Sequence, residues 1–162
     1  MVEKLVRVQS SIELHLADQI INLVLTLRST NNLLPLSVAI LDSGGNLVSF
    51  KREDGCGILR HNIAIAKAWA ALGMGMSTRQ IRDRLADRPS FQAGLAAASD
   101  GRFIPTPGGV LILNNNSFAI GAVGVSGDAS DKDEFCAIEA IRQAGFIPEP
   151  SMPSKNWNEN QL

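Results

Sequence analysis

The sequence has few of the residues on which several classes of protein depend. Its 162 residues include two cysteines, two histidines, two tryptophans and no tyrosine, and aromatic residues make up 5% of the chain. Two cysteines do not make a disulfide framework, and neither histidine has a His, Cys or carboxylate cluster at metal-ligand spacing. We therefore expect no metal site, and little aromatic lining for a large flat cofactor.

Excess charge and long hydrophobic runs are also missing. Fifteen Lys and Arg residues against 16 Asp and Glu residues leave a net charge of -1, which provides no general field for nucleic acid or an anionic membrane. No segment approaches the roughly 18 unbroken apolar residues of a membrane span. Residues 1–11 lack the apolar core of a secretory signal. These observations predict a cytoplasmic protein with neither nucleic acid nor membrane as its partner.

The residues that are abundant indicate a folded domain. Hydrophobic residues make up 45% of the chain, which excludes disorder for its body, and there are 14 glycines among many alanines. A chain of this length can bury about two thirds of its unfolded surface in one core. We expect a single domain over residues 1–147, followed by a polar, proline-containing tail over residues 148–162.

Periodicity predicts helices that alternate with two β-hairpins. Serines 10 and 11 open an amphipathic helix that runs to about residue 31, and turn residues 42–45 join strands 36–41 and 46–51. Further helices are expected over 59–73, from 77 and over 89–98, a second hairpin over 110–113 and 118–126, and a last helix over 130–144. Adjacent antiparallel strands with helices segregated between them predict an α+β fold.

One candidate site lies on the helix that carries Arg60, His61 and Lys67. Arg60 and Lys67 are seven residues apart, so they project about 20° apart on one helix face. Together they could bind a carboxylate, and a desolvated Lys67 could act as a base or Schiff-base amine. Alternatively, Lys67 extends its ammonium group to solvent beside an alanine-rich packing face. His61 is a candidate axial haem ligand or general base.

A second candidate is the glycine-rich run at residues 121–134. Ser130 and Asp133 form an expected capping box at a helix start, where acidic residues complement the helix dipole. Glu134 is a candidate acid–base residue, although the same dipole explains it equally well. Gly108 and Gly109 could present bare amides to a ligand carboxylate or could simply form a turn. Both cysteines, Cys56 and Cys136, are interpreted as small packed residues.

Taken in order, six short motifs resemble the GlcG/HbpS-like family, also called the haem-degrading domain family. They are residues 42–48 (DSGGNLV), 52–55 (REDG), 66–68 (AKA), 107–110 (PGGV), 121–127 (GAVGVSG) and 133–134 (DE). The resemblance covers about residues 8–147. It implies a profilin-like fold, in which helices pack on an antiparallel β-sheet, and it implies a homo-oligomer.

The resemblance implies a small-ligand-binding protein, with haem or a related tetrapyrrole as the ligand class and cofactor. Carboxylates would then pair with Arg60 and Lys67, and His61 would be the axial donor. The other ligand-binding residues would be Asp54, Gly108, Gly109, Ser126 and Gly127.

Two alternatives remain open. The first is an enzyme that acts on a small anionic carbonyl compound or hydroxy acid as an isomerase, lyase or ring-opening hydrolase. In it, Lys67, His61 or Glu134 would be catalytic and would move the proton. The second is a structural oligomerisation module, in which Trp157 of the tail docks onto a neighbouring protomer.

Overall fold

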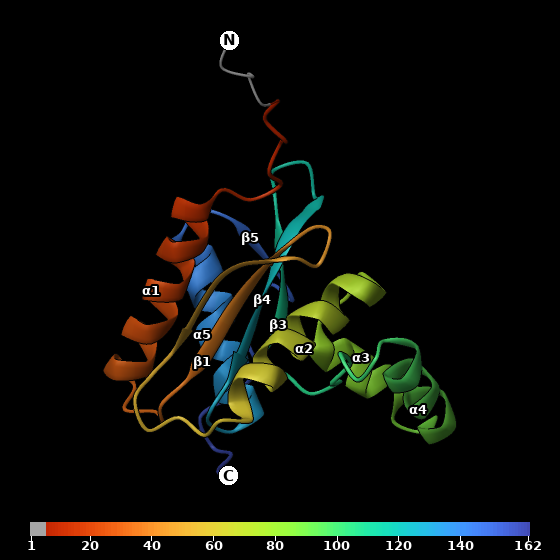
Figure 1. Cartoon of the computed structure of the whole chain (residues 1–162). Coiled ribbons are helices and arrows are strands. Elements are labelled where there is room, and N and C mark those ends of the chain that lie inside the picture. The colour runs from red at the N-terminus through yellow and green to blue at the C-terminus, as the bar shows by residue number, and fades with distance from the viewer. Residues whose placement is uncertain (1–5) are drawn as a thin grey trace.

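The fold is a five-stranded antiparallel sheet with helices on both faces, as described for residues 6–162 in a computed structural model (Figure 1). Residues 1–5, on which the cytoplasmic expectation partly rests, lie outside the described residues. Along the chain the elements are α1 (Leu14–Thr30), β1 (Ser37–Asp42), β2 (Leu47–Arg52), α2 (Arg60–Met74), α3 (Thr78–Leu85), α4 (Pro89–Ala98), β3 (Gly109–Leu113), β4 (Ala119–Ser126), α5 (Ser130–Gln143) and β5 (Ile147–Glu149). The predicted α+β class is confirmed.

The strand order is β2-β1-β4-β3-β5, and every neighbouring pair is antiparallel. Both predicted hairpins, β1–β2 and β3–β4, are present, and they join through β1 and β4. Strand β5 pairs with β3 at the sheet edge. It takes in Pro148 and Glu149, which belong to the expected tail, because three residues are too few to show a strand period in the sequence.

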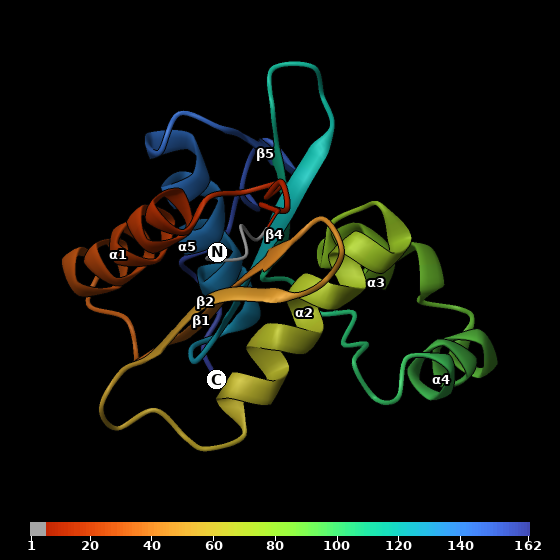
Figure 2. The same cartoon turned by 45° about the horizontal axis from the view of Figure 1, so that its top comes forward.

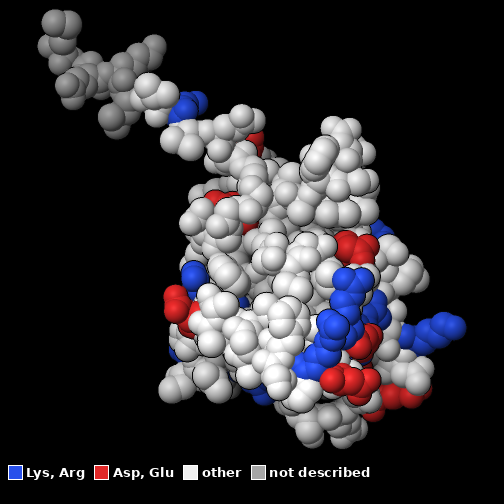
Figure 3. All heavy atoms as spheres, turned by 90° about the vertical axis from the view of Figure 1, so that its right-hand side faces the viewer, with Lys and Arg blue, Asp and Glu red and all other residues white. Residues whose placement is uncertain are grey.

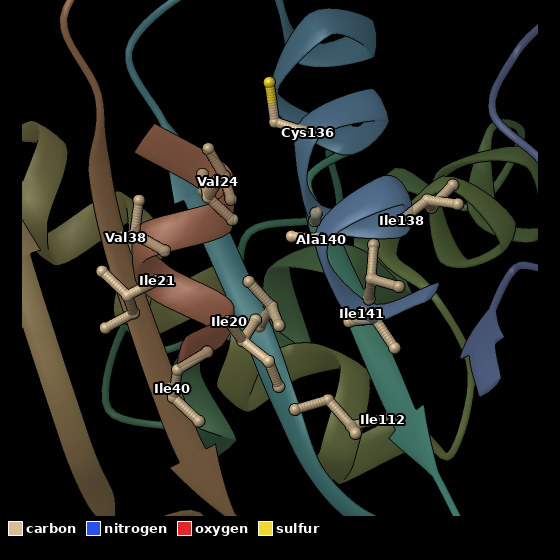
Figure 4. Close-up of a cluster of buried hydrophobic side chains, with 14 of the residues drawn as sticks. Ile20, Ile21, Val24, Val38, Ile40, Ile112, Cys136, Ile138, Ala140 and Ile141 are labelled. Atoms are coloured by element: carbon tan, nitrogen blue, oxygen red, sulfur yellow. The ribbon is translucent and has the colours of Figure 1, made fainter. Parts of the chain in front are cut away.

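Helices α1 and α5 cover one face of the sheet with large aliphatic side chains. In Figure 4, Ile20, Ile21 and Val24 of α1 lie against the sheet beside Ile138 and Ile141 of α5. All five are fully buried. Each such side chain stabilises the fold by about 1.5–3 kcal/mol through burial, so this face provides most of the hydrophobic core.

Helix α2 covers the other face at very short distance, and α3 and α4 extend away from the sheet beyond it (Figures 1 and 2). The close approach occurs where Gly109 of β3 and Gly124 of β4 stand opposite each other in the strand register. A Cβ atom at Gly124 would lie 1.8 Å from the Ala64 carbonyl oxygen, and one at Gly109 would lie 2.3 Å from the Lys67 carbonyl oxygen. The backbone of α2 therefore rests directly on two strands that have no side chains at this point.

The expected caps of two helices are wrong, although α5 does begin at Ser130 as predicted. Helix α1 begins at Leu14 with no side-chain cap, and the Ser11 hydroxyl instead accepts a hydrogen bond from the Ser43 amide. The capping box of α5 does not form. Ala129 precedes the helix, and Asp133 accepts its hydrogen bond from the amide of Asp128. In both cases the side chain that the local motif would use as a cap instead accepts a hydrogen bond from another backbone amide.

The C-terminal segment, residues 150–162, lies along α5. The Trp157 ring stacks on Phe135 of α5 with ring centres 3.6 Å apart. Arg79 of α3 donates a hydrogen bond to the Met152 carbonyl oxygen at 2.7 Å. Trp157 is thus packed against its own chain. Within residues 6–162, no helix combines the length and the apolar character needed to cross a membrane.

Candidate functional site

Lys67 is buried at the centre of the α2 face of the sheet, with 2% of its surface exposed. Its Nζ atom donates hydrogen bonds to the Val125 carbonyl oxygen at 2.9 Å and to Asp133 Oδ2 at 3.1 Å. Asp133 is fully buried as well. The ammonium group is therefore paired inside the protein, contrary to the alternative in which it reaches solvent.

The glycine pair explains how a lysine comes to be buried there. Because Gly109 and Gly124 let the α2 backbone touch the sheet, the Lys67 side chain starts at the sheet surface and extends toward the end of β4. Gly108, at a φ of 120°, makes room beside it, since a Cβ atom there would lie 2.9 Å from Nζ. Close backbone packing thus places the charge in the interior.

Asp133 and Asp128 hold the start of α5 around this charge. Asp133 Oδ1 accepts a hydrogen bond from the Asp128 amide at 3.0 Å. Burial raises the pKa of Asp133, and the charge of Lys67 opposes that rise. Burial also acts to raise the pKa of Asp128, but hydrogen bonds from the amides of Leu34 and Ala129, together with the charge of Lys132, outweigh it, so this pKa is lowered. The two carboxyl groups connect α5 to α2 and to the segment before β1.

Arg60 lies at the same end of β4, as its spacing from Lys67 predicts. Its Nη1 atom is 3.4 Å from the hydroxyl of Ser126, which follows Val125. Ser37, the register partner of Ser126, has its hydroxyl 3.3 Å from the sulfur of Cys56. Arg60 is half-buried. The polar groups at this end therefore run from the buried Lys67 to a guanidinium group at the surface.

His61 lies on the first turn of α2. Its Nδ1 atom is 2.7 Å from the carbonyl oxygen of Ile58, and its ring meets Phe50 edge-on at 6.2 Å. A carbonyl oxygen only accepts hydrogen bonds, so Nδ1 is the donor, and Nε2 carries the lone pair whenever the imidazole is neutral. Ile58 and Leu59 beside it are 79% and 64% exposed. This end of α2 therefore combines the Nε2 atom of His61 with an uncovered apolar surface.

Glu134 has different surroundings. It is fully buried, neither carboxylate oxygen has a hydrogen-bond partner, and the nearest cation is Arg79, whose Nε is 3.4 Å from Oε1. Burial raises the pKa of Glu134 to about 7. Lys67, His61 and Glu134, the candidate acid–base residues, thus each have separate partners.

The remaining candidates have varied surroundings. Asp54 is exposed in the loop between β2 and α2. The amide of Gly109 donates to the Thr78 hydroxyl at 2.8 Å. A Cβ atom at Gly127 would lie 2.2 Å from the Pro35 carbonyl oxygen. The backbones of Gly109 and Gly127 are therefore committed to packing. Within the described part of the chain, no group of three or more His, Cys, Asp or Glu side chains could hold a metal ion.

Sequence reasoning missed the partners of the two buried charges. The sequence predicts a helix-capping role for Asp133 and no role for Arg79. The missed signal is chemical: a lysine among alanines and a carboxyl pair at a helix start both need opposite charges if they are buried. No spacing rule connects residue 67 with residue 133, or 79 with 134, because the sheet brings them together.

Comparison with known proteins agrees with this architecture. The family model described as haem-degrading protein HbpS-like matches residues 12–142. A relative from Citrobacter freundii, an uncharacterized 15.0 kDa protein encoded between dhaT and dhaS, is 30% identical over 107 residues, which cover 66% of this chain and 74% of the relative.

Solved structures share the fold. ORFY of Klebsiella pneumoniae, assigned to DUF336, has a TM-score of 0.75 and 28% identity, with 90% of this chain and 97% of that chain covered. The PduOC complex with heme has a TM-score of 0.75 and 23% identity, with 83% and 96% covered. HbpS of Streptomyces reticuli, in a double-mutant form, has a TM-score of 0.71 and 22% identity, with 88% and 92% covered. With the match over residues 12–142, this chain belongs to the HbpS-like family of haem-degrading proteins.

Proposed function

We propose that this protein binds haem at the N-terminal end of α2, with Nε2 of His61 as the axial ligand. The observation that carries the proposal is the 2.7 Å contact between His61 Nδ1 and the Ile58 carbonyl oxygen. Such a contact sets the tautomer and orientation of a metal-binding imidazole. Family membership and the heme-bound state of PduOC support haem as the ligand class.

The surroundings of His61 suit a porphyrin better than a bare metal ion. Exposed Ile58 and Leu59 offer aliphatic contact to the ring, and the partly exposed Arg60 guanidinium can pair with a propionate. Bound haem would supply a redox-active iron at this surface. Lys67 is not available to pair with a propionate, because its ammonium group is already paired with Asp133.

These side chains cover one side of a flat ligand. We therefore include a homo-oligomer in the proposal, in which a second copy covers the other side. Equilibrium ultracentrifugation with and without haem would measure the association. A monomer that binds haem tightly at all concentrations would contradict this part.

Haem titration followed by the Soret absorbance tests the site. The wild-type protein should show a saturable spectral shift, and His61→Ala should weaken binding at least tenfold because the axial bond is lost. The matched control is His15→Ala, which removes the other histidine, an exposed residue on α1. Equal haem affinity in His61→Ala and wild type, or no saturable shift at micromolar protein, would refute the proposal.

A further inference from the structure

An apolar cavity lies between α2 and α4, and His61 is not among the residues that line it. It has a volume of about 170 Å³. Trp69, Gly73 and Met74 line it from α2, and Leu95, Ala98 and Phe103 line it from α4 and the loop that follows. Both walls are apolar, so the cavity does not resemble the polar region around Lys67.

The polar groups beside the cavity are those of Ser99 and Arg102. Ser99, its one hydroxyl-bearing wall residue, donates from Oγ to the Ala96 carbonyl oxygen at 3.0 Å. Arg102 donates from Nε to the Ser99 carbonyl oxygen at 3.1 Å, and its guanidinium lies 4.6 Å from the centre of the Trp69 ring. A ligand here would find an aromatic ring and aliphatic groups and would lose any hydrogen bonds that it made in water.

Gly73 and α4 indicate that this space is kept open. Glycine within a helix costs about 0.5–1 kcal/mol relative to alanine, yet a Cβ atom at Gly73 would meet only the edge of the Trp69 ring at 3.5 Å, an ordinary contact. Sterics therefore do not require glycine there. No residue of α4 is buried. Its Leu95 is partly buried and packs against the neighbouring apolar cluster of Ala70, Ile81, Leu85 and Phe103.

The surface around α4 also suits an uncharged ligand. Residues 89–99 include no charged side chain. Figure 3, which views the molecule from the α3–α4 side, shows an uncharged area beside a band of mixed acidic and basic side chains. An apolar cavity of about 150 Å³ accepts benzene, and this cavity has a similar volume but opens to solvent at Ala98, which is exposed.

We propose that the cavity between α2 and α4 binds an uncharged one-ring aromatic group, which packs beside Trp69 and joins α4 to α2. The ligand gains dispersion contacts with both walls. Because α4 has little other support, binding also protects its backbone from local opening. This site is separate from the proposed haem site, so either can exist without the other.

Isothermal titration calorimetry of the full-length protein with benzene tests the proposal. We expect saturable binding, at least tenfold weaker in Ala98→Leu, whose longer side chain fills the cavity. The matched control is Ala97→Leu, the same change at the neighbouring exposed residue, which does not line the cavity and should bind as wild type does. Circular dichroism would verify that both variants fold.

Two further measurements sharpen the test. Benzoate should bind at least tenfold more weakly than benzene, because burying its carboxylate would go uncompensated. Saturating benzene should slow hydrogen exchange of the α4 amides several-fold. Absence of benzene binding, equal binding by Ala98→Leu and wild type, tighter binding of benzoate, or unchanged α4 exchange would each overturn the proposal.

Discussion

The two faces of the sheet are packed in different ways. On the α1–α5 face, isoleucine and valine side chains fill the space between helix and strand, and the core there consists of apolar residues. On the α2 face, alanines of the helix meet glycines of the strands, and the layer contains the buried ion pair of Lys67 and Asp133. Burial of large aliphatic side chains stabilises the first face. Close contact between the α2 backbone and the strands, around the buried Lys67, characterises the second.

This difference indicates where function can be placed. On the α1–α5 face large side chains separate helix from sheet, whereas on the α2 face short side chains bring the helix backbone close enough to carry Lys67 inside. The cost is that its charge must be matched by Asp133. The three predictions below test this contrast, from the largest expected effect to the smallest.

Breaking the buried ion pair should have the largest effect. Asp133→Asn keeps the shape of the side chain but leaves the Lys67 ammonium buried without an opposite charge, and we expect a loss of about 3–5 kcal/mol in the free energy of unfolding. Urea denaturation would measure it. Asp131→Asn, on the same helix turn but only partly buried, should cost less than about 1 kcal/mol.

A double variant separates charge from packing. Adding Lys67→Met to Asp133→Asn removes the unmatched charge and should restore a large part of the lost stability. If the double variant is as unstable as the sum of the two single variants, the pair does not interact as described.

Closing the gap between α2 and the sheet should have the next largest effect. The Cβ atom of Gly124→Ala would collide with the Ala64 carbonyl oxygen, so α2 must move, at a cost of about 2–3 kcal/mol. On the opposite face, Ile20→Val removes one buried methylene and should cost about 0.5–1.5 kcal/mol. Thermal unfolding of both variants would compare the faces, and a milder effect at Gly124 than at Ile20 would contradict the contrast.

Glu134 should give the smallest change and one that depends on pH. Its pKa is raised to about 7 from an ordinary value of 4.5, so the folded protein binds the proton more tightly than the unfolded chain does. Stability should therefore fall as the pH rises from about 4.5 to about 7 and then level off. Glu134→Gln should remove this dependence and stabilise the protein by roughly 2 kcal/mol at pH 6, with little change at pH 4.5.

Denaturation curves at several pH values would show this dependence. Glu139→Gln, a partly exposed neighbour on α5, should change stability by less than about 1 kcal/mol at any pH. A Glu134→Gln variant that is destabilised at pH 8 would show that pairing with Arg79 outweighs the cost of burial.

Much of the fold was predictable from the sequence because local patterns specify it. The amphipathic period of α1, the turn between β1 and β2 and the glycine-rich β4 all act over short distances. The start of α1 at Leu14 and the absence of a capping box at α5 were not predictable, since Ser11 and Asp133 bond to distant or preceding backbone groups instead. Strand β5 forms by pairing with the free edge of β3, so the three residues of β5 do not show it by themselves.

The site was predictable in position but not in chemistry. The spacing of Arg60 and Lys67 does bring both to the end of β4. Whether Lys67 faces a ligand or an internal carboxylate depends on the depth of α2 against the sheet, which the register of Gly109 with Gly124 determines. Such a register is a property of the assembled sheet, so local sequence patterns do not contain it.

The stacking of Trp157 on Phe135 has a practical consequence. The chain has two tryptophans, one on each side of the sheet: Trp157 rests on α5 and Trp69 belongs to α2. Two variants that each keep one tryptophan would therefore report on the two sides of the sheet separately by their intrinsic fluorescence. Trp157 would signal detachment of the C-terminal segment, and Trp69 would signal events between α2 and α4, so the order in which the two layers separate during unfolding can be followed without an added label.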